Sequence, residues 1–248
     1  MIHSFLMIGQ SNMAGRGTIG EVPPIGNTHL KMLRNGRWQP MTSPVNPDRI
    51  FSGISLAESF ADAYQKSHDV DVGLIPCADG GTQIRQWAEG GLLFDHAVCQ
   101  ARLAMRTSNL AGVLWHQGES DCHPGLCETY LSHLEGFYEA LCRALDLART
   151  PFIVGGLGDY LHALPEEDRY VDDVNAQILA FVQAHPMTAF ASARGLEGKS
   201  DHLHFTAASA RALGLRYYDA FLSIEPRTRH FEEKPCEDDA LRTAIDAL

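Results

Sequence analysis

The sequence predicts a three-layer α/β/α fold, in which helices cover both faces of a central, mostly parallel sheet of about five strands. Two observations lead to this prediction. The chain contains short apolar runs of strand length, and between these runs lie segments whose apolar residues recur every three or four positions. Such alternation is typical of parallel strands that are joined by crossover helices.

The expected strands are apolar throughout, which is the pattern of strands that are buried on both faces. The first is the run FLMIG, and the later runs follow it at intervals that leave room for a helix. The expected strands lie at residues 5–9, 70–76, 111–116, 151–157 and 188–193.

The expected helices have one apolar face at helical spacing. In the first of them Leu56, Phe60 and Tyr64 fall on the same side. The same spacing predicts helices over residues 54–67, 94–107, 127–148, 173–185 and 207–222.

Two stretches do not follow this alternation. Residues 16–50 are rich in Gly, Pro and Asn and have no periodicity, so we expect an ordered loop over one edge of the strand ends. Residues 227–248 carry many charges, and we expect them to form an extension with a short helix. A chain of 248 residues fits one sizeable domain, which we place at residues 1–226.

Composition argues against several classes of protein. An apolar content of 45% and a charged content of 21% are typical of a globular protein. The net charge of −11 argues against nucleic acid and anionic membranes as partners, because both favour a basic surface. No run approaches the roughly 18 apolar residues of a membrane span, and the N-terminus lacks the pattern of a signal peptide.

The cysteines point to a reducing compartment. The six cysteines include no CxxC pair and no dense framework, so reduced thiols and a cytoplasmic location are expected. The sequence does not indicate an oligomeric state.

Four polar clusters stand at the ends of predicted strands or at the start of a helix. Because the carboxyl ends of parallel strands share one rim of the sheet, we expect the clusters to meet there. They are GQSNMAG at 9–15, PCADGGTQIRQW at 76–87, HQGESD at 116–121 and SDHLHFT at 200–206.

The clusters contain the residue types of a serine hydrolase. Ser11 needs a base to remove its proton, and a histidine titrates at about pH 6.5, close to a working pH. Asp201 and His204 are three residues apart, which lets the carboxylate hold the second imidazole nitrogen. Serine early with Asp and His late is the chain order of α/β serine hydrolases, although the G-x-S-x-G elbow is absent.

Taken in order, the four clusters resemble the SGNH (GDSL-like) hydrolase superfamily. The form GQSNM, GGT, HQGESD, DxxHF is similar to its branch of carbohydrate acetylesterases, which includes sialate O-acetylesterase-like and acetylxylan esterase proteins. The resemblance runs from about residue 5 to residue 222 and implies the flavodoxin-like fold of that superfamily. It also implies that Ser11 is the nucleophile, His204 the general base and Asp201 the acid that orients it.

The resemblance further implies an oxyanion hole. Its donors would be the backbone N–H of Ser11, the backbone N–H of Gly80 or Gly81, and the side-chain amide of Gln117, which replaces the usual asparagine. Glu119 is a possible second acid for His204, and the alternative is a structural acid that holds neighbouring loops.

Four residues are expected to contact the substrate, namely Gln10, Asn12, Arg85 and His202. Asn12 is also suited to fixing the turn after the first strand. Trp87 is a candidate for the same site, and a place in the core is equally consistent with the sequence.

These features predict a cofactor-free serine esterase that removes O-acetyl groups through an acetyl-enzyme intermediate. The expected substrate is a small-molecule or oligosaccharide acetyl ester, and the carbohydrate class comes from the resemblance alone. The alternatives are a general short-chain esterase on non-sugar esters and a non-catalytic carbohydrate-binding module. A metal-dependent hydrolase would draw on His116, Asp121, His123, His202 and His204, but no H-E-x-x-H motif is present, so no metal is expected.

Overall fold

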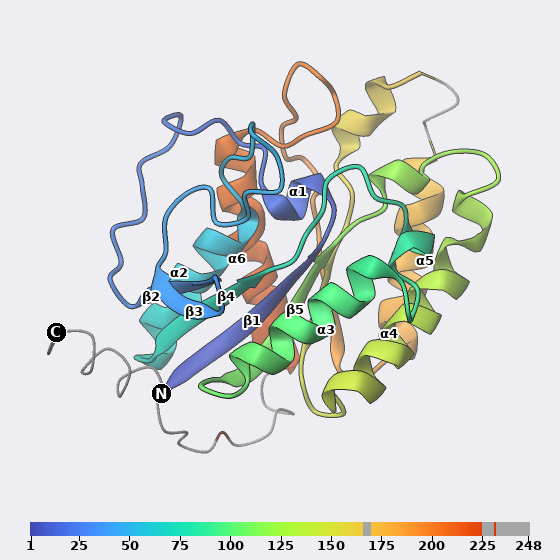
Figure 1. The fold of residues 1–248 in the computed structure, drawn as a ribbon. Helices are drawn as coiled ribbons and strands as arrows, with labels where there is room; N and C mark the ends of the chain where they lie inside the picture. Colours follow the sequence, from blue (N-terminus) through green and yellow to red (C-terminus); the bar gives the residue numbers. More distant parts are fainter. Residues whose placement is uncertain (166–169, 225–230, 232–248) are drawn as a thin grey trace, which may run out of the picture.

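A seven-stranded sheet forms the middle layer of the protein in the computed structural model, which describes residues 1–165, 170–224 and 231 (Figure 1). The strand order is β3-β2-β4-β1-β5-β6-β7, and all neighbours are parallel except the pair β2 and β3. The strands are β1 (Ile2–Gly9), β2 (Leu30–Arg34), β3 (Arg37–Pro40), β4 (Asp71–Pro76), β5 (Asn109–His116), β6 (Phe152–Gly155) and β7 (Thr188–Ala191).

The predicted α/β fold class is confirmed, and the expected number of strands is corrected to seven. The five expected strands correspond to β1, β4, β5, β6 and β7. The two extra strands form an antiparallel hairpin inside residues 16–50, which we expected to be a loop. Asn35 and Gly36 join them with φ angles of 52° and 72°, as a type I′ hairpin turn requires.

The helices form two layers, one on each face of the sheet (Figure 1). Helices α2 (Leu56–His68) and α6 (Ala207–Ile224) pack together on one face. Helices α3 (Leu92–Ala104), α4 (Tyr130–Leu145) and α5 (Val171–Ala184) cover the other face, and all of these helices overlap expected ones. Within the described part of the chain, none of the helices has both the length and the apolar character that a membrane crossing needs.

Both faces of β1 are buried, which explains its unbroken apolar sequence. Phe5 and Met7 lie in the core cluster with α2 and α6, whereas Leu6 and Ile8 lie in the cluster with α3, α4 and α5. All four side chains are fully buried. Burying such a side chain contributes roughly 1.5–3 kcal/mol, so the sheet is held mainly by apolar packing on its two sides.

The strand order reverses at β1, which has β4 on one side and β5 on the other. This switch point is where open α/β sheets bind their ligands. The strands β1 and β5 approach closely there, as the position of Gly9 shows: a Cβ atom on Gly9 would lie 2.1 Å from the carbonyl oxygen of His116.

Four short helical segments follow strand ends or link elements: α1 (Ser11–Ala14), η1 (Ile84–Trp87), η2 (Glu119–Asp121) and η3 (Cys127–Thr129).

Two further segments remain, one before the gap at residues 166–169 and one at the C-terminal end. The helical turn η4 (Asp159–Ala163) follows β6. The expected extension at 227–248, with its short helix, lies outside the described residues apart from Phe231, which packs against His3.

Two glycines test the packing of the helix layers. A Cβ atom on Gly214 of α6 would lie 2.0 Å from the carbonyl oxygen of Leu56 in α2, whereas a Cβ atom on Gly136 of α4 would meet nothing within 4 Å. We therefore expect Gly214→Ala to lower the free energy of unfolding by about 1–3 kcal/mol through overpacking. Gly136→Ala is the matched control and should raise it by about 0.5–1 kcal/mol. Urea unfolding of both variants checks this, and equal effects would contradict the close α2–α6 contact.

Candidate active site

Ser11 begins the first turn of helix after β1. Gln10 caps this turn with extended backbone angles, and Ser11 is 4% exposed. The first N–H groups of a helix have no partner inside it. Among the described residues, the backbone N–H of Ser11 has no acceptor. The hydroxyl and the free N–H of Ser11 therefore stand together at the rim of the sheet.

The structure brings Ser11, His204 and Asp201 together. Nε2 of His204 lies 3.1 Å from Oγ of Ser11, and Nδ1 of His204 lies 2.8 Å from Oδ2 of Asp201. A carboxylate only accepts hydrogen bonds, so Nδ1 carries the hydrogen and Nε2 faces the serine hydroxyl. This is the geometry in which an imidazole can take a proton from a serine.

The backbone around His204 keeps Asp201 ionised. The other oxygen of Asp201, Oδ1, accepts the N–H groups of Leu203 and His204 at 3.0 Å each. Burial acts to raise the pKa of Asp201, but the hydrogen bond from the His204 side chain and these two N–H groups outweigh it and lower the pKa below its ordinary value. The carboxylate facing His204 is therefore charged at neutral pH.

Glu119 has no hydrogen bond to His204 among the described residues and binds two other residues. Its Oε1 accepts the side-chain amide of Asn12 at 2.5 Å and lies 3.2 Å from Nε2 of His116. Complete burial acts to raise the pKa of Glu119, but the charge and hydrogen bond of His116 and the bond from Asn12 lower it overall. The structure thus favours the structural-acid interpretation of Glu119 over a second acid for His204.

Asn12 is an internal brace of the site, and its expected contact with substrate stays a prediction. It is 3% exposed. Its Nδ2 also donates to the carbonyl oxygen of Leu203 at 3.1 Å, and its Oδ1 accepts the N–H of Phe205 at 3.1 Å. These two residues flank His204, so Asn12 connects the residue after Ser11 to both neighbours of the histidine.

Gln10 and Gln117 are buried, and one side-chain atom of each binds other residues of the protein. Oε1 of Gln117 has no partner among the described residues. Oε1 of Gln10, a residue 1% exposed, accepts the N–H of Gly118 and the side-chain amide of Gln117. Nε2 of Gln117 lies 3.0 Å from the carbonyl oxygen of Thr82 and 2.6 Å from Oδ2 of Asp121. An amide has two hydrogens, and in this conformation neither is left for a substrate oxygen.

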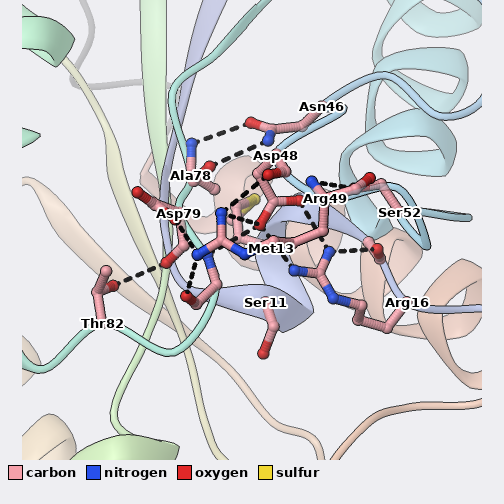
Figure 2. Close-up of polar contacts among 12 residues, drawn as sticks. Ser11, Met13, Arg16, Asn46, Asp48, Arg49, Ser52, Ala78, Asp79 and Thr82 are labelled. Carbon is pink, nitrogen blue, oxygen red and sulfur yellow. Dashed lines mark hydrogen bonds and ion pairs between the residues drawn. The ribbon is translucent and has the colours of Figure 1, made fainter.

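A buried ion pair lies beside Ser11 (Figure 2). Arg16 and Asp48 form two parallel hydrogen bonds of 2.9 Å and 2.7 Å, and their side chains are 4% and 6% exposed. Oδ2 of Asp48 also accepts the backbone N–H of Gly80 at 2.9 Å. Burial acts to raise the pKa of Asp48, but bonds from Arg16, Ser52 and Gly80 lower it overall.

Sequence reasoning missed this ion pair. Both residues belong to the stretch 16–50, and their pairing bridges 32 positions. The one available signal was that Arg16 directly follows the GQSNMAG cluster.

The two glycines of the second cluster have different environments. The N–H of Gly80 is taken by Asp48, and Nη2 of Arg49 donates to the carbonyl oxygen of Gly80 at 2.9 Å. Because the C=O and N–H of one trans peptide unit point in opposite directions, this second bond directs the N–H of Gly81 away from Arg49. Gly81 has a φ of +81°, and its N–H has no acceptor among the described residues. Gly81 is thus the glycine with a free donor.

The remaining predicted residues lie at the rim or in the core. Arg85 is exposed on η1, and His202 is exposed with a φ of 54°. Trp87 is fully buried and packs edge-on against Trp115, with ring centroids 5.4 Å apart, so it belongs to the core. No group of three or more metal-ligating side chains occurs in the part of the chain that the structure describes.

Comparisons with known proteins show what the chain as a whole is similar to. The model of the family described as carbohydrate esterase, sialic acid-specific acetylesterase, matches residues 1–223. A protein of Arabidopsis thaliana, named as a probable carbohydrate esterase, is 29% identical over 244 residues, which are 88% of this chain and 90% of that protein. The crystal structure of an Arabidopsis thaliana protein has a TM-score of 0.79 at 28% identity and covers 89% of this chain and 98% of its own.

More distant structures share the fold. NanS has a TM-score of 0.71 at 17% identity, and the match covers 90% of this chain and 97% of NanS. A carbohydrate acetylesterase from Xanthomonas citri has a TM-score of 0.68 at 17% identity, and the match covers 90% of this chain and 56% of that one.

The Arg16–Asp48 pair predicts a pH-dependent contribution to stability. Because the pKa of Asp48 is lowered in the folded protein, its stabilisation is complete above the ordinary value of 3.8 and is lost as the pH falls below it. We expect Asp48→Asn to lower the free energy of unfolding by about 3–5 kcal/mol at pH 7, because it leaves the Arg16 charge buried without its partner. The deficit should shrink as the pH falls below 3.8.

Denaturant unfolding of both proteins across this pH range measures the difference. The exposed Asp219→Asn on α6 is the control and should show neither effect. A deficit that is the same at every pH would contradict an ionised Asp48 in the folded state.

Proposed function

The chain belongs to the sialic acid-specific acetylesterase family of carbohydrate esterases, and on that premise we propose that it is a serine esterase which removes O-acetyl groups from a carbohydrate or similar polar molecule. Membership makes it a carboxylic ester hydrolase and confirms the resemblance of its four polar clusters. The observation that supports the proposed mechanism is the contact of Ser11 with Nε2 of His204, whose Nδ1 is hydrogen-bonded to Asp201.

In the proposed first step, Oγ of Ser11 attacks the carbonyl carbon of the acetyl ester while Nε2 of His204 takes the hydroxyl proton. The imidazole becomes positively charged, and the ionised Asp201 at 2.8 Å stabilises that charge. The carbonyl oxygen becomes an oxyanion bound to a tetrahedral carbon.

Two backbone N–H groups would bind this oxyanion, those of Ser11 and Gly81. Both are without acceptors among the described residues, which supports their assignment over Gly80 and Gln117, whose N–H groups are occupied. A fixed donor aimed at a developing oxyanion contributes roughly 2.7–4 kcal/mol to transition-state stabilisation. The bond from Arg49 to the Gly80 carbonyl holds the Gly81 donor in position before substrate arrives.

The tetrahedral intermediate then collapses. The C–O bond to the sugar breaks, and the proton on Nε2 of His204 passes to the departing sugar oxygen. An acetyl group remains on Ser11. His204, again neutral, takes a proton from water, which attacks the acetyl carbon to form a second tetrahedral intermediate. The bond from that carbon to Oγ then breaks, the proton on Nε2 passes to Oγ, and acetic acid leaves and ionises in solution.

The first test removes the nucleophile. We expect Ser11→Ala to lower kcat for 4-nitrophenyl acetate by about a thousandfold or more, because no other hydroxyl hydrogen-bonds to the His204 side chain in the described structure. Far-UV circular dichroism should be the same for both proteins. A chelator should leave wild-type turnover intact. Equal turnover by both proteins would overturn the proposed nucleophile, and loss of activity on chelation would favour a metal-dependent hydrolase.

The second test separates the two candidate acids. We expect Asp201→Asn to lower kcat by about 10³–10⁴-fold, because the amide cannot hold His204 in the required tautomer. Glu119→Gln should act mainly on stability, since Glu119 contacts His116 and Asn12. Measuring kcat and the urea midpoint for both variants decides between them. A larger loss of kcat in a well-folded Glu119→Gln protein would assign the acid to Glu119 instead.

A further inference from the structure

The loop of residues 48–52 at the edge of the site, here called the rim loop, is held closed by its own hydrogen bonds. Oγ of Ser52 donates to Oδ1 of Asp48 at 2.7 Å and accepts the N–H of Arg49 at 3.0 Å. The N–H of Ser52 bonds to the carbonyl oxygen of Arg49 at 3.1 Å. Because Asp48 is fixed by Arg16 in turn, the rim loop is anchored to the segment that follows Ser11.

The tip of this braced loop presents two large apolar side chains to solvent. Ile50 is 105% exposed and Phe51 is 66% exposed. A single exposed apolar residue needs no explanation, but adjacent exposed apolar residues beside a functional site typically mark a contact surface. The hydrogen bonds of the rim loop join residues on either side of Ile50 and Phe51, and the two side chains between them are exposed.

Phe51 is connected to the nucleophile through two residues. The ring centroid of Phe51 lies 5.3 Å from the guanidinium carbon of Arg16. A Cβ atom built on Gly80 would lie 2.4 Å from Nη2 of Arg16 and 3.4 Å from Cβ of Ser11. Phe51, Arg16, Gly80 and Ser11 thus form a continuous series from the rim to the site.

The contact with Arg16 also orients the ring. A guanidinium is attracted to the face of an aromatic ring, so the buried Arg16 holds one face of Phe51 against the protein. Most of the side chain remains open to solvent. A ring whose orientation is fixed in advance loses little conformational freedom when a ligand packs on it.

We propose that Phe51, with Ile50 beside it, forms an apolar subsite that packs against the ring of the sugar whose acetyl group is removed. This deepens the proposed function and rests on it. A sugar ring has hydroxyl groups around its edge and C–H groups on its faces. The negative face of an aromatic ring attracts such C–H groups, so Phe51 would select acetyl esters of sugars over acetyl esters of simple alcohols.

The test compares esters with and without a sugar ring. The substrates are glucose pentaacetate, O-acetylated sialic acid and ethyl acetate, and acid release is followed in a pH-stat. We expect Phe51→Ala to lower the ratio of kcat/KM for the better sugar to that for ethyl acetate by about tenfold, chiefly through KM. Phe51→Tyr retains the aromatic face and should retain the ratio.

The matched control is Leu222→Ala, because Leu222 is a 41% exposed apolar residue towards the end of α6. It should leave the ratio as in the wild type. A Phe51→Ala protein with the wild-type ratio, or a wild type that prefers neither sugar to ethyl acetate, would overturn the subsite alone. A wild type that hydrolyses none of the three esters would overturn the proposed function, and the subsite with it.

Discussion

The pairing of β1 with a parallel strand on each side determines where the groups of the site lie. Met7 is level with Pro76 at the end of β4, and Gly9 is level with His116 at the end of β5. The three strands therefore end at nearly the same height, and the segments that follow them start at one rim. A shift of one residue in this register would turn every side chain of β1 to the opposite face, so the apolar packing on both faces fixes the rim as well.

The sequence was sufficient to locate the strands that are buried on both faces, and insufficient to locate the strands that are only partly buried. Strands covered on both faces leave unbroken apolar runs, and these runs located β1, β4, β5, β6 and β7. The edge hairpin of β2 and β3 has short strands of mixed polarity, so it was hidden in residues 16–50. The dipeptide Asn35–Gly36 was its one local signal, because these residues adopt the positive φ angles of a tight hairpin turn.

The candidate site was predictable in its residue types but less so in its individual bonds. Ser11, Asp201 and His204 could be selected from chain order and spacing. The state of each N–H group could not be predicted, because the N–H of Gly80 is taken by Asp48, which lies 32 positions away. Buried polar side chains near a site also form hydrogen bonds of their own, and the sequence did not indicate the internal partners of Asn12, Gln10 and Gln117.

The proposed nucleophile and base are 193 residues apart in the chain. A ribosome releases the N-terminal part first, so β1 and Ser11 leave it long before His204 does. The bonds that place His204 come from Asn12 and Asp201, and these can form only when the loop before α6 has emerged. An unfinished chain thus carries Ser11 without the histidine that we propose activates it. The hydrolytic power of each molecule would therefore arise late in its synthesis, and incomplete copies would leave the esters around them intact.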